Sequence, residues 1–392
     1  MERNLKTPYF MIKEKELKDN TKKLHKALKE TWGNYIIGYS CKTNSLPWIL
    51  KFMQNNNCYA EVVSDSEYEL VRKIGFGTNQ IIFNGPNKGK DSFINAIKSG
   101  SIVNIDSNRE IQWIKEQEFN NEVFVGIRVN FDLDKECPNE TSYGKEGSRF
   151  GFSFENGSLE LAIKQLNNIK NVKVVGIHIH YTAQTRSLSV YKVLAQKACE
   201  ISKLFDYELK YIDIGGGFFG GVPNKPSYYE YMSLISRELS KEFDSNKTQL
   251  IIEPGSAIIG SPIDFVCTVV DVKDTFSKRI VTVNGSRNNI DPFFKKTSYF
   301  YSIKSKNENI IPEQIICGYT CLDYDRIFKL ENEKELFIGD EIIFNKVGAY
   351  TMSLSPLFIE YFPDIYVEKI NGTIDCVRKK WGVGEYIQNC NW

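Results

Sequence analysis

The sequence lacks the features of a membrane protein or of a nucleic-acid-binding protein. Its 50 Lys and Arg residues balance 49 Asp and Glu residues, so the formal net charge is only +1. Without a surplus of one sign, the chain has no global electrostatic footprint for nucleic acid or an anionic membrane. No apolar run is long enough to cross a bilayer, and the start, MERNLKTPYFMIKEKEL, lacks the apolar core of a signal peptide. We therefore predict a cytoplasmic protein whose partner is a small molecule.

Paired cysteines and histidine clusters are also missing. The nine cysteines form no CxxC pair, and their odd number favours reduced thiols over a complete set of disulfides. Only three histidines are present. His178 and His180 form an HxH pair, but the third, His25, has no obvious companion ligand. We expect no metal site.

The common nucleotide-binding motifs are absent. The run Gly215–Gly217 matches neither GxGxxG nor the P-loop pattern, and GPNKGKD at 85–91 lacks the spacing and the Ser or Thr of a P-loop. Three consecutive residues without Cβ still let backbone N–H groups approach an anion closely. A tight strand-to-helix turn would often need only one glycine, so the run favours a phosphate-bearing cofactor over a nucleotide.

What the chain does contain is a repeated strand and helix unit. At 392 residues it exceeds one ordinary domain. Eight β-branched or aromatic runs alternate with stretches of helical period, which predicts a (β/α)8 TIM-like barrel and an α/β fold class. The runs are 35–42, 59–64, 80–85, 101–106, 122–130, 173–180, 209–217 and 249–256. The longest connection, 131–172, holds a polar stretch of the kind that is usually mobile or functional.

After residue 261 the pattern changes to alternating strands without long helical stretches, which predicts a second, mainly antiparallel β domain. The expected strands are 264–272, 279–285, 297–305, 314–321, 340–350 and 372–380. The N-terminal YFMIKEKEL indicates one extended run and then a helix, and this segment could belong to either domain. We assign 24–262 to the barrel, and 1–23 with 263–392 to a β-barrel or sandwich-like domain that completes the active site.

Reactive residues gather where the predicted barrel strands end, which is where parallel barrels carry their catalytic groups. A partly desolvated Lys42 would have a nucleophilic amine, although a lysine that snorkels or pairs with a carboxylate is the simpler alternative. Glu253 is placed either to charge a heteroaromatic nitrogen or to form a salt bridge across the barrel mouth. His180 is expected to pack flat on a planar cofactor, and His178 to be a hydrogen-bonded core residue. The strand ends comprise Lys42, Ser64, Asn84, Asp106, Arg128, His180, Gly215–Gly217 and Glu253–Gly255.

Six segments, in order, resemble the ornithine/diaminopimelate/arginine decarboxylase family, which are alanine-racemase-like (fold type III) pyridoxal-phosphate enzymes. They are GYSCKTN (38–44), GIHIHYTAQ (176–184), DIGGGF (213–218), EPGSAI (253–258), CGYTCLDYD (317–325) and GAYTMSLS (348–355). The resemblance covers nearly the whole chain. It implies a pyridoxal-phosphate barrel plus a β domain, and an enzyme that releases CO2 and an amine from an amino acid.

The resemblance also implies roles for individual residues. Lys42 would bind pyridoxal 5′-phosphate covalently, His180 would stack on its pyridine ring, and Glu253 would pair with the ring nitrogen. The phosphate would be held by Gly215, Gly216, Gly217, Gly255, the Ser256 hydroxyl and Tyr350. The implied assembly is a homodimer in which Cys321 of the neighbouring subunit reprotonates the substrate carbanion.

Two departures from the family pattern concern the cofactor. Where the family usually has EPGR, this chain has EPGS, so Ser256 offers a hydroxyl in place of a guanidinium. The motif usually written HVGSQ is HYTAQ here, and Ala183 removes a polar contact near the cofactor.

Two further departures concern the substrate. Decarboxylases of basic amino acids carry Asp or Glu after the cysteine, but this chain has Leu322, and strand alternation would send Asp323 to the other face. Where diaminopimelate decarboxylases have an arginine for the distal carboxylate, NGSRNNIDPFF (284–294) places Asp291, with Arg287 nearby. We therefore expect ornithine, lysine and meso-diaminopimelate to be poor substrates. The expected substrate is a non-standard amino acid or amino-acid conjugate, as in a siderophore or antibiotic pathway.

Three other functions remain open at this point, of which the most distant is a metal-dependent barrel hydrolase, testable by metal analysis. An amino-acid racemase or epimerase shares the cofactor and the lysine, but racemases of this fold keep the ring nitrogen uncharged with an arginine, whereas this chain has Glu253. A non-catalytic, decarboxylase-like regulatory binding protein is the second alternative. The presence of Lys42, His180, Glu253 and Cys321 together argues against it.

Overall fold

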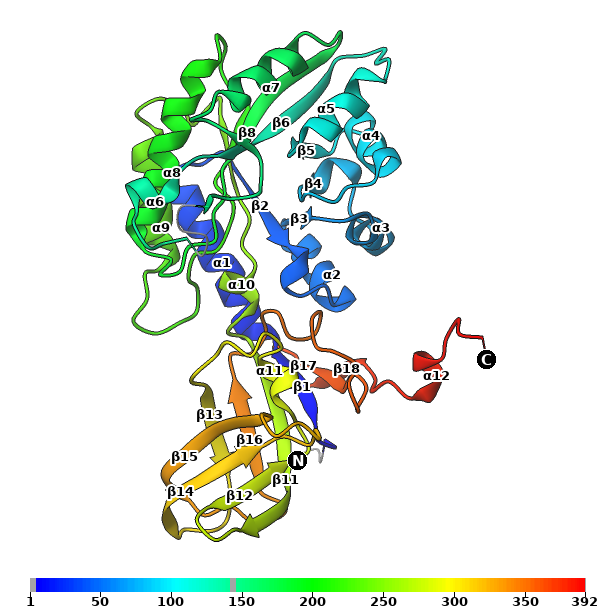
Figure 1. Ribbon diagram of the computed structural model, residues 1–392, viewed down its shortest axis with the longest axis vertical. Coiled ribbons are helices and arrows are strands. Elements are labelled where there is room, and N and C mark those ends of the chain that lie inside the picture. Colours follow the sequence, from blue (N-terminus) through cyan, green and yellow to red (C-terminus); the bar gives the residue numbers. More distant parts are fainter. Residues whose placement is uncertain (1–4, 142–145, 392) are drawn as a thin grey trace. The chain divides into compact units, whose positions relative to one another are not determined.

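The computed structural model describes residues 5–141 and 146–391, and the chain divides into two compact units (Figure 1). One unit is Asn20–Ala257, and the other combines the segment up to Asp19 with Ile258–Trp392. Both borders stand a few residues before those assigned from the sequence. In the part of the chain that is described, no helix has the length and apolar character needed to span a membrane.

The Asn20–Ala257 unit is a closed parallel barrel, so the predicted fold class is confirmed. Each strand pairs in parallel with the next, and the β5–β6 pairing closes the ring. Every predicted barrel strand is present, although most end before the predicted residue. The strands are β2 (Tyr35–Ser40), β3 (Tyr59–Val62), β4 (Ile81–Phe83), β5 (Ile102–Ile105), β6 (Val123–Asn130), β8 (Val172–His178), β9 (Tyr211–Asp213) and β10 (Gln249–Ile252).

Helices follow the strands, and their ends follow local sequence signals. Ser64 caps α3 by accepting the Glu67 N–H at 3.2 Å, and Gly75 ends that helix in a left-handed conformation at φ 112°. The helices are α1 (Glu14–Thr31), α2 (Pro47–Asn55), α3 (Asp65–Ile74), α4 (Lys90–Lys98), α5 (Asn108–Lys115), α6 (Leu133–Glu136), α7 (Ser158–Asn167), α8 (Leu188–Ile201), α9 (Tyr228–Leu239) and α10 (Ser256–Ile259).

The barrel interior is filled by side chains, so it is a packed core and not a channel. The Tyr211 ring occupies space that glycines leave open, since a Cβ at Gly126 or Gly176 would lie 2.0 or 2.3 Å from its atoms. The Tyr211 hydroxyl donates to Asn104 Oδ1 at 2.8 Å, which satisfies this buried polar group. Polar side chains that do chemistry are therefore confined to the ends of the strands.

The long connection after β6 contains α6, α7 and a short strand, β7 (Phe152–Ser153), that pairs with β6. Residues 142–145 of its polar stretch lie outside the described residues. The described part returns to the barrel at Gly151, whose φ of 74° and close approach to Arg128 exclude a side chain.

The second unit contains a nine-stranded sheet in which most pairs are antiparallel, while β1–β17 and β12–β14 are parallel. The N-terminal run β1 pairs with β11 and β17, so it belongs to this unit. The strands are β1 (Tyr9–Lys13), β11 (Ile263–Asp274), β12 (Arg279–Val283), β13 (Phe300–Lys304), β14 (Ile310–Cys317), β15 (Arg326–Lys334), β16 (Glu341–Asn345), β17 (Asp364–Glu368) and β18 (Ile374–Arg378).

The sequence did not predict β15 and β17. Strand β15, RIFKLENEK, is largely charged, and only two of its nine side chains are buried, so apolar alternation is weak. Two predicted strands were too long, because β14 ends at Cys317 and β16 ends at Asn345. The motifs around Cys321 and Tyr350 therefore lie in loops.

Candidate active site

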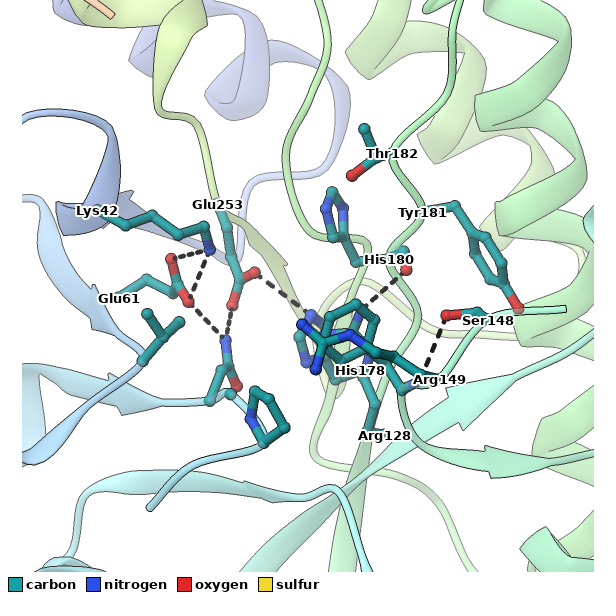
Figure 2. Close-up of a pocket in the computed structure, with 15 residues that line it drawn as sticks. Lys42, Glu61, Arg128, Ser148, Arg149, His178, His180, Tyr181, Thr182 and Glu253 are labelled. Atoms are coloured by element: carbon teal, nitrogen blue, oxygen red, sulfur yellow. Dashed lines mark hydrogen bonds and ion pairs between the residues drawn. The ribbon is translucent and has the colours of Figure 1, made fainter. Parts of the chain in front are cut away.

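A pocket of about 300 Å³ opens at the carboxyl ends of the barrel strands (Figure 2). All of its lining comes from the Asn20–Ala257 unit. The lining residues are Lys42, Glu61, Val63, Asn84, Gly85, Pro86, Arg128, Ser148, Arg149, Phe150, His178, His180, Tyr181, Thr182 and Glu253. The structure thus brings together Lys42, His180 and Glu253, which were singled out from distant parts of the sequence.

Lys42 is held at the pocket by Glu61. It lies in a 3-10 turn, η1 (Cys41–Thr43), and its Nζ is 3.2 Å from Glu61 Oε2 and 3.5 Å from Oε1. With 43% of its side chain exposed, Lys42 is only partly withdrawn from solvent, and it pairs with a carboxylate as the simpler alternative supposed. Glu61 was not among the site residues predicted from the sequence. A charged residue within the otherwise apolar run of β3 was the available signal.

Glu61 is a buried anchor for this part of the site. Only 1% of its side chain is exposed. Ser40 Oγ donates to Oε2 at 2.6 Å, and Asn84 Nδ2 lies 3.3 Å from Oε1. Because its oxygens are already engaged by fixed donors, Glu61 fixes the direction in which the Lys42 amine points.

Glu253 follows β10 and sits in a buried polar cluster. Asn84 Nδ2 donates to Oε1 at 2.6 Å, and His178 Nε2 lies 3.3 Å from Oε2. Asp213, at the end of β9, is fully buried and accepts the Gly215 N–H at 2.8 Å. This contact is an ion pair only when His178 is protonated, and burial lowers the pKa of His178, so the salt bridge that the sequence left open for Glu253 stays a prediction.

The pKa values of the two carboxyl groups in this cluster are shifted in opposite directions. Burial, followed by the charge of Glu253, raises the pKa of Asp213 well above its usual range. Burial alone would raise the pKa of Glu253 too, but His178 and a hydrogen bond from Asp213 outweigh burial and lower it. Asp213 therefore carries the proton, and Glu253 remains an anion.

His180 presents a neutral imidazole to the pocket. Burial, and then the charge of Arg128, lower its pKa well below the usual value. Its ring lies 6.4 Å from that of His178, centroid to centroid, at an interplanar angle of 17°, which confirms that both side chains share one face. Within the described residues, His180 Nδ1 is buried without a hydrogen-bond partner. This flat, neutral ring suits stacking on a planar group.

The glycines after β9 have a packing reason as well as a possible ligand role. A Cβ at Gly216 would lie 1.9 Å from the Glu253 carbonyl oxygen, and one at Gly215 would lie 2.5 Å from His180. Gly215 and Gly217 also have φ values of 71° and 92°. At Gly255, a Cβ would lie 2.0 Å from Thr43 Oγ1, next to Lys42. The glycines therefore let backbone pass directly beside the proposed cofactor-binding side chains.

Two arginines, Arg128 and Arg149, line the pocket, and only Arg128 was predicted from the sequence. Arg128 Nη2 donates to the His180 carbonyl at 3.0 Å. The guanidinium carbons of Arg128 and Arg149 lie 5.4 and 4.5 Å from the Phe150 ring centroid. Arg149 and Phe150 come from the long polar connection, whose length was the only sequence signal. This cationic side can attract a carboxylate or another anion.

His178, Asp213 and Glu253 also place one ligand atom each within 4.8 Å of one another, as a metal site would require. The same closeness is explained by the shared proton and by the backbone contact of Asp213. A metal would have to displace both, since carboxylate ligands bind in the deprotonated form.

Ser256 begins α10 in the Asn20–Ala257 unit, and the remaining predicted site residues belong to the second unit. Cys321 is exposed in the loop between β14 and β15. Residues 318–325 form no strand, so the prediction that strand alternation sends Asp323 to the other face is wrong. Asp325, which the sequence analysis missed, organises this loop. Its Oδ2 accepts from Ser286 Oγ at 3.0 Å and from Thr320 Oγ1 at 2.7 Å.

Arg287 and Asp291 form a closed pair. Arg287 Nη2 and Nε lie 2.9 and 3.1 Å from Asp291 Oδ2, and only 4% of the Asp291 side chain is exposed. Tyr350 adopts a left-handed conformation, φ 56°, with its ring 5.9 Å from that of Phe293. All nine cysteines are free, which confirms the prediction of thiols.

Comparison with known proteins is consistent with this geometry. The family model described as "Pyridoxal-dependent decarboxylase, pyridoxal binding domain" matches residues 16–260. The diaminopimelate decarboxylase of Aquifex aeolicus is 24% identical over 385 residues, covering 95% of this chain and 89% of that protein. That of Campylobacter jejuni is 26% identical over 378 residues, covering 91% and 89%.

Solved structures show the same fold. The crystal structure of diaminopimelate decarboxylase from M. jannaschii has a TM-score of 0.89 at 23% sequence identity, covering 98% of this chain and 92% of that one. The arginine decarboxylase of Paramecium bursaria Chlorella virus has a TM-score of 0.78 at 21% identity, covering 93% and 96%. Both similarities extend over the barrel and the β unit.

Proposed function

This chain belongs to the pyridoxal-dependent decarboxylases, and from that premise we propose that it removes CO2 from an amino acid other than ornithine, lysine or meso-diaminopimelate. Its cofactor is pyridoxal 5′-phosphate. The observation that carries the proposal is that one pocket is lined by Lys42, His180 and the Glu253 carboxylate, which Asn84 Nδ2 holds at 2.6 Å. A carboxylate there favours the protonated, electron-withdrawing form of a pyridine ring.

The residues present fit the cofactor. Lys42 supplies an amine at the pocket, and Glu253 supplies the partner for the ring nitrogen. His180 offers a neutral ring with an unsatisfied nitrogen, and the glycines leave a cradle that a Cβ would fill. When bound, pyridoxal phosphate supplies a sink for the electron pair that stays on Cα as CO2 leaves.

The chain's own groups then control orientation and protons. Glu61 holds Lys42 Nζ at 3.2 Å, so the amine is presented in one direction and has a carboxylate beside it to share its proton. The Arg128 side of the pocket attracts the substrate carboxylate. We assign the proton that replaces CO2 at Cα to the thiol of Cys321, which is exposed on a loop fixed by Asp325. A thiol in this role requires a reducing compartment, in keeping with the cytoplasmic prediction.

We propose that Cys321 comes from a second copy of the chain in a homodimer. The exposed apolar side chains of Leu354, Leu357, Phe358 and Ile359, between 36% and 54% exposed, support an interface near the Tyr350 motif. Exposed apolar residues that gather in one short segment are a frequent mark of protein contact.

The proposed substrate preference is supported by the Arg287–Asp291 pair. A guanidinium that already binds a buried carboxylate through two nitrogens has little charge left for the distal carboxylate of a substrate. Leu322 offers no partner for a distal ammonium group. The curated relatives are named diaminopimelate decarboxylases, so meso-diaminopimelate is the second candidate substrate.

The test is a panel of amino acids and conjugates given to the cofactor-loaded protein, with CO2 release and amine product measured by mass spectrometry. The Lys42→Ala variant is the blank. We expect ornithine, lysine and meso-diaminopimelate to have kcat/KM values roughly 100-fold or more below the best substrate. Efficient turnover of any of the three would refute the substrate proposal. Exchange of the Cα hydrogen with solvent deuterium, without CO2 release, would indicate a racemase.

A further inference from the structure

The loop after β8 carries an arginine in an unusual position. Arg186 has a left-handed backbone, φ 54°, which a residue with a Cβ adopts only at a cost in strain. The Tyr231 hydroxyl, on α9, donates to the Arg186 carbonyl at 2.6 Å and holds the backbone in place. Strained residues that neighbouring groups hold in place are concentrated at functional sites.

The Arg186 side chain is directed to two elements of the proposed phosphate site. Its Nη1 donates to Ser256 Oγ at 3.4 Å, next to Gly255. Its guanidinium carbon lies 5.2 Å from the ring centroid of Phe219, which follows the Gly215–Gly217 run. The guanidinium therefore stands between the glycines after β9 and the segment after β10.

Tyr191 provides an independent link to the same glycines. Its hydroxyl donates to the Gly216 carbonyl at 3.1 Å. Burial raises the pKa of Tyr191, and the positive charge of Arg186 is close enough to oppose that rise. Arg186 thus lies close to a side chain that contacts the glycine turn.

The described residues contain no ion-pair partner for this charge. Among residues 5–141 and 146–391, no carboxylate forms an ion pair with Arg186, and its side chain is neither fully buried nor fully exposed. A half-buried guanidinium that retains most of its donors is suited to bind a phosphate. Position 256, where the resembled family carries an arginine, is here the serine that Arg186 contacts.

We infer that Arg186 supplies the guanidinium that binds the 5′-phosphate of pyridoxal phosphate, in place of an arginine at position 256. Ser256 accepts a hydrogen bond from Arg186 and keeps its own hydroxyl proton to donate to the phosphate. The phosphate would thus be bound by a charge from the loop after β8 and by backbone N–H groups after β9. This inference rests on the proposed cofactor site.

The experiment compares the affinities of the cofactor-free protein for pyridoxal phosphate and for pyridoxal, which lacks the phosphate. Dissociation constants come from absorbance titrations, so activity is not needed. Arg186→Gln should weaken binding of pyridoxal phosphate roughly 10- to 100-fold, the size expected for a lost charge-assisted hydrogen bond. Binding of pyridoxal should change by no more than about twofold, because the substitution leaves the ring site intact.

Lys225→Gln is the matched control, because Lys225 Nζ lies 5.0 Å from the same Phe219 ring. It should leave both affinities unchanged. Adding Ser256→Arg to Arg186→Gln returns a guanidinium to position 256 and should recover most of the lost affinity for pyridoxal phosphate. Arg186→Lys keeps the charge without the planar fork and should be intermediate.

The outcomes separate the possible roles. Unchanged binding of pyridoxal phosphate by Arg186→Gln would overturn the inference. Equal losses for pyridoxal and pyridoxal phosphate would overturn it too, because they would show a structural role. So would an equally large effect of Lys225→Gln. A wild-type protein that binds neither compound would refute the proposed cofactor site itself.

Discussion

Asp213 offers the sharpest test of the electrostatics at this site. If it carries a proton, its side chain donates to Glu253 and accepts the Gly215 N–H at 2.8 Å. Asp213→Asn reproduces both contacts without a charge, because an amide also has a donor and an acceptor. Asp213→Ala removes both contacts and leaves a buried N–H unsatisfied.

The magnitudes follow from these contacts. Asp213→Ala should lower the free energy of unfolding by about 3–5 kcal/mol, from a lost hydrogen bond to a charged group and one unsatisfied buried donor. Asp213→Asn at acid pH should change it by no more than about 1 kcal/mol.

The free energy of unfolding should also depend on pH, and the size of this dependence can be predicted. The folded state keeps Asp213 protonated. Above the pKa that Asp213 has in the unfolded chain, the unfolded state therefore binds fewer protons than the folded state. The free energy of unfolding of the wild type consequently falls as the pH rises. Asp213→Asn removes this effect. Relative to wild type, it should therefore gain about 1.4 kcal/mol per pH unit between the unfolded pKa of Asp and its raised folded pKa.

The assay is urea unfolding of wild type, Asp213→Asn and Asp213→Ala at a series of pH values, followed by circular dichroism with the cofactor removed. Absorbance titrations then compare their affinities for pyridoxal phosphate. We expect Asp213→Asn to keep its affinity, because Glu253 remains an anion. If Asp213→Asn were as damaging as Asp213→Ala, or if its stability relative to wild type did not rise with pH, Asp213 would not be the protonated partner.

Two further predictions concern Lys42 and Cys321. Lys42→Ala should lose the visible absorbance of lysine-bound cofactor and roughly 10³-fold or more of the activity, whereas Lys42→Arg, which keeps the charge but not the nucleophile, should be equally inactive. Retained turnover in either variant would refute the assigned role. Cys321→Ala should keep cofactor binding and lose the amine product. Mixing it with Lys42→Ala should restore about a quarter of wild-type activity if each site takes residues from two copies. Recovery that stays at background after subunit exchange, measured by mass spectrometry, would argue against a shared site.

The sequence alone determined the architecture, because strands and helices are local. Period-two and period-3.6 patterns revealed every barrel strand and placed Lys42, His180 and Glu253 at strand ends, where closure of the barrel brings them together. The pattern failed for β15, since five of its nine residues are charged and its apolar alternation is weak.

The tertiary structure decided which side chains are partners. Nothing local in the sequence shows that Glu61 holds Lys42. Nor does it show that Asp213, and not Glu253, carries the proton. The pairing of Arg287 with Asp291 is equally invisible in the sequence. It also took the folded chain to bring Arg186 to Ser256, 70 residues away along the sequence. Charge and protonation depend on distance and burial, and both are properties of the folded chain, whereas secondary structure is encoded in the order of neighbouring residues.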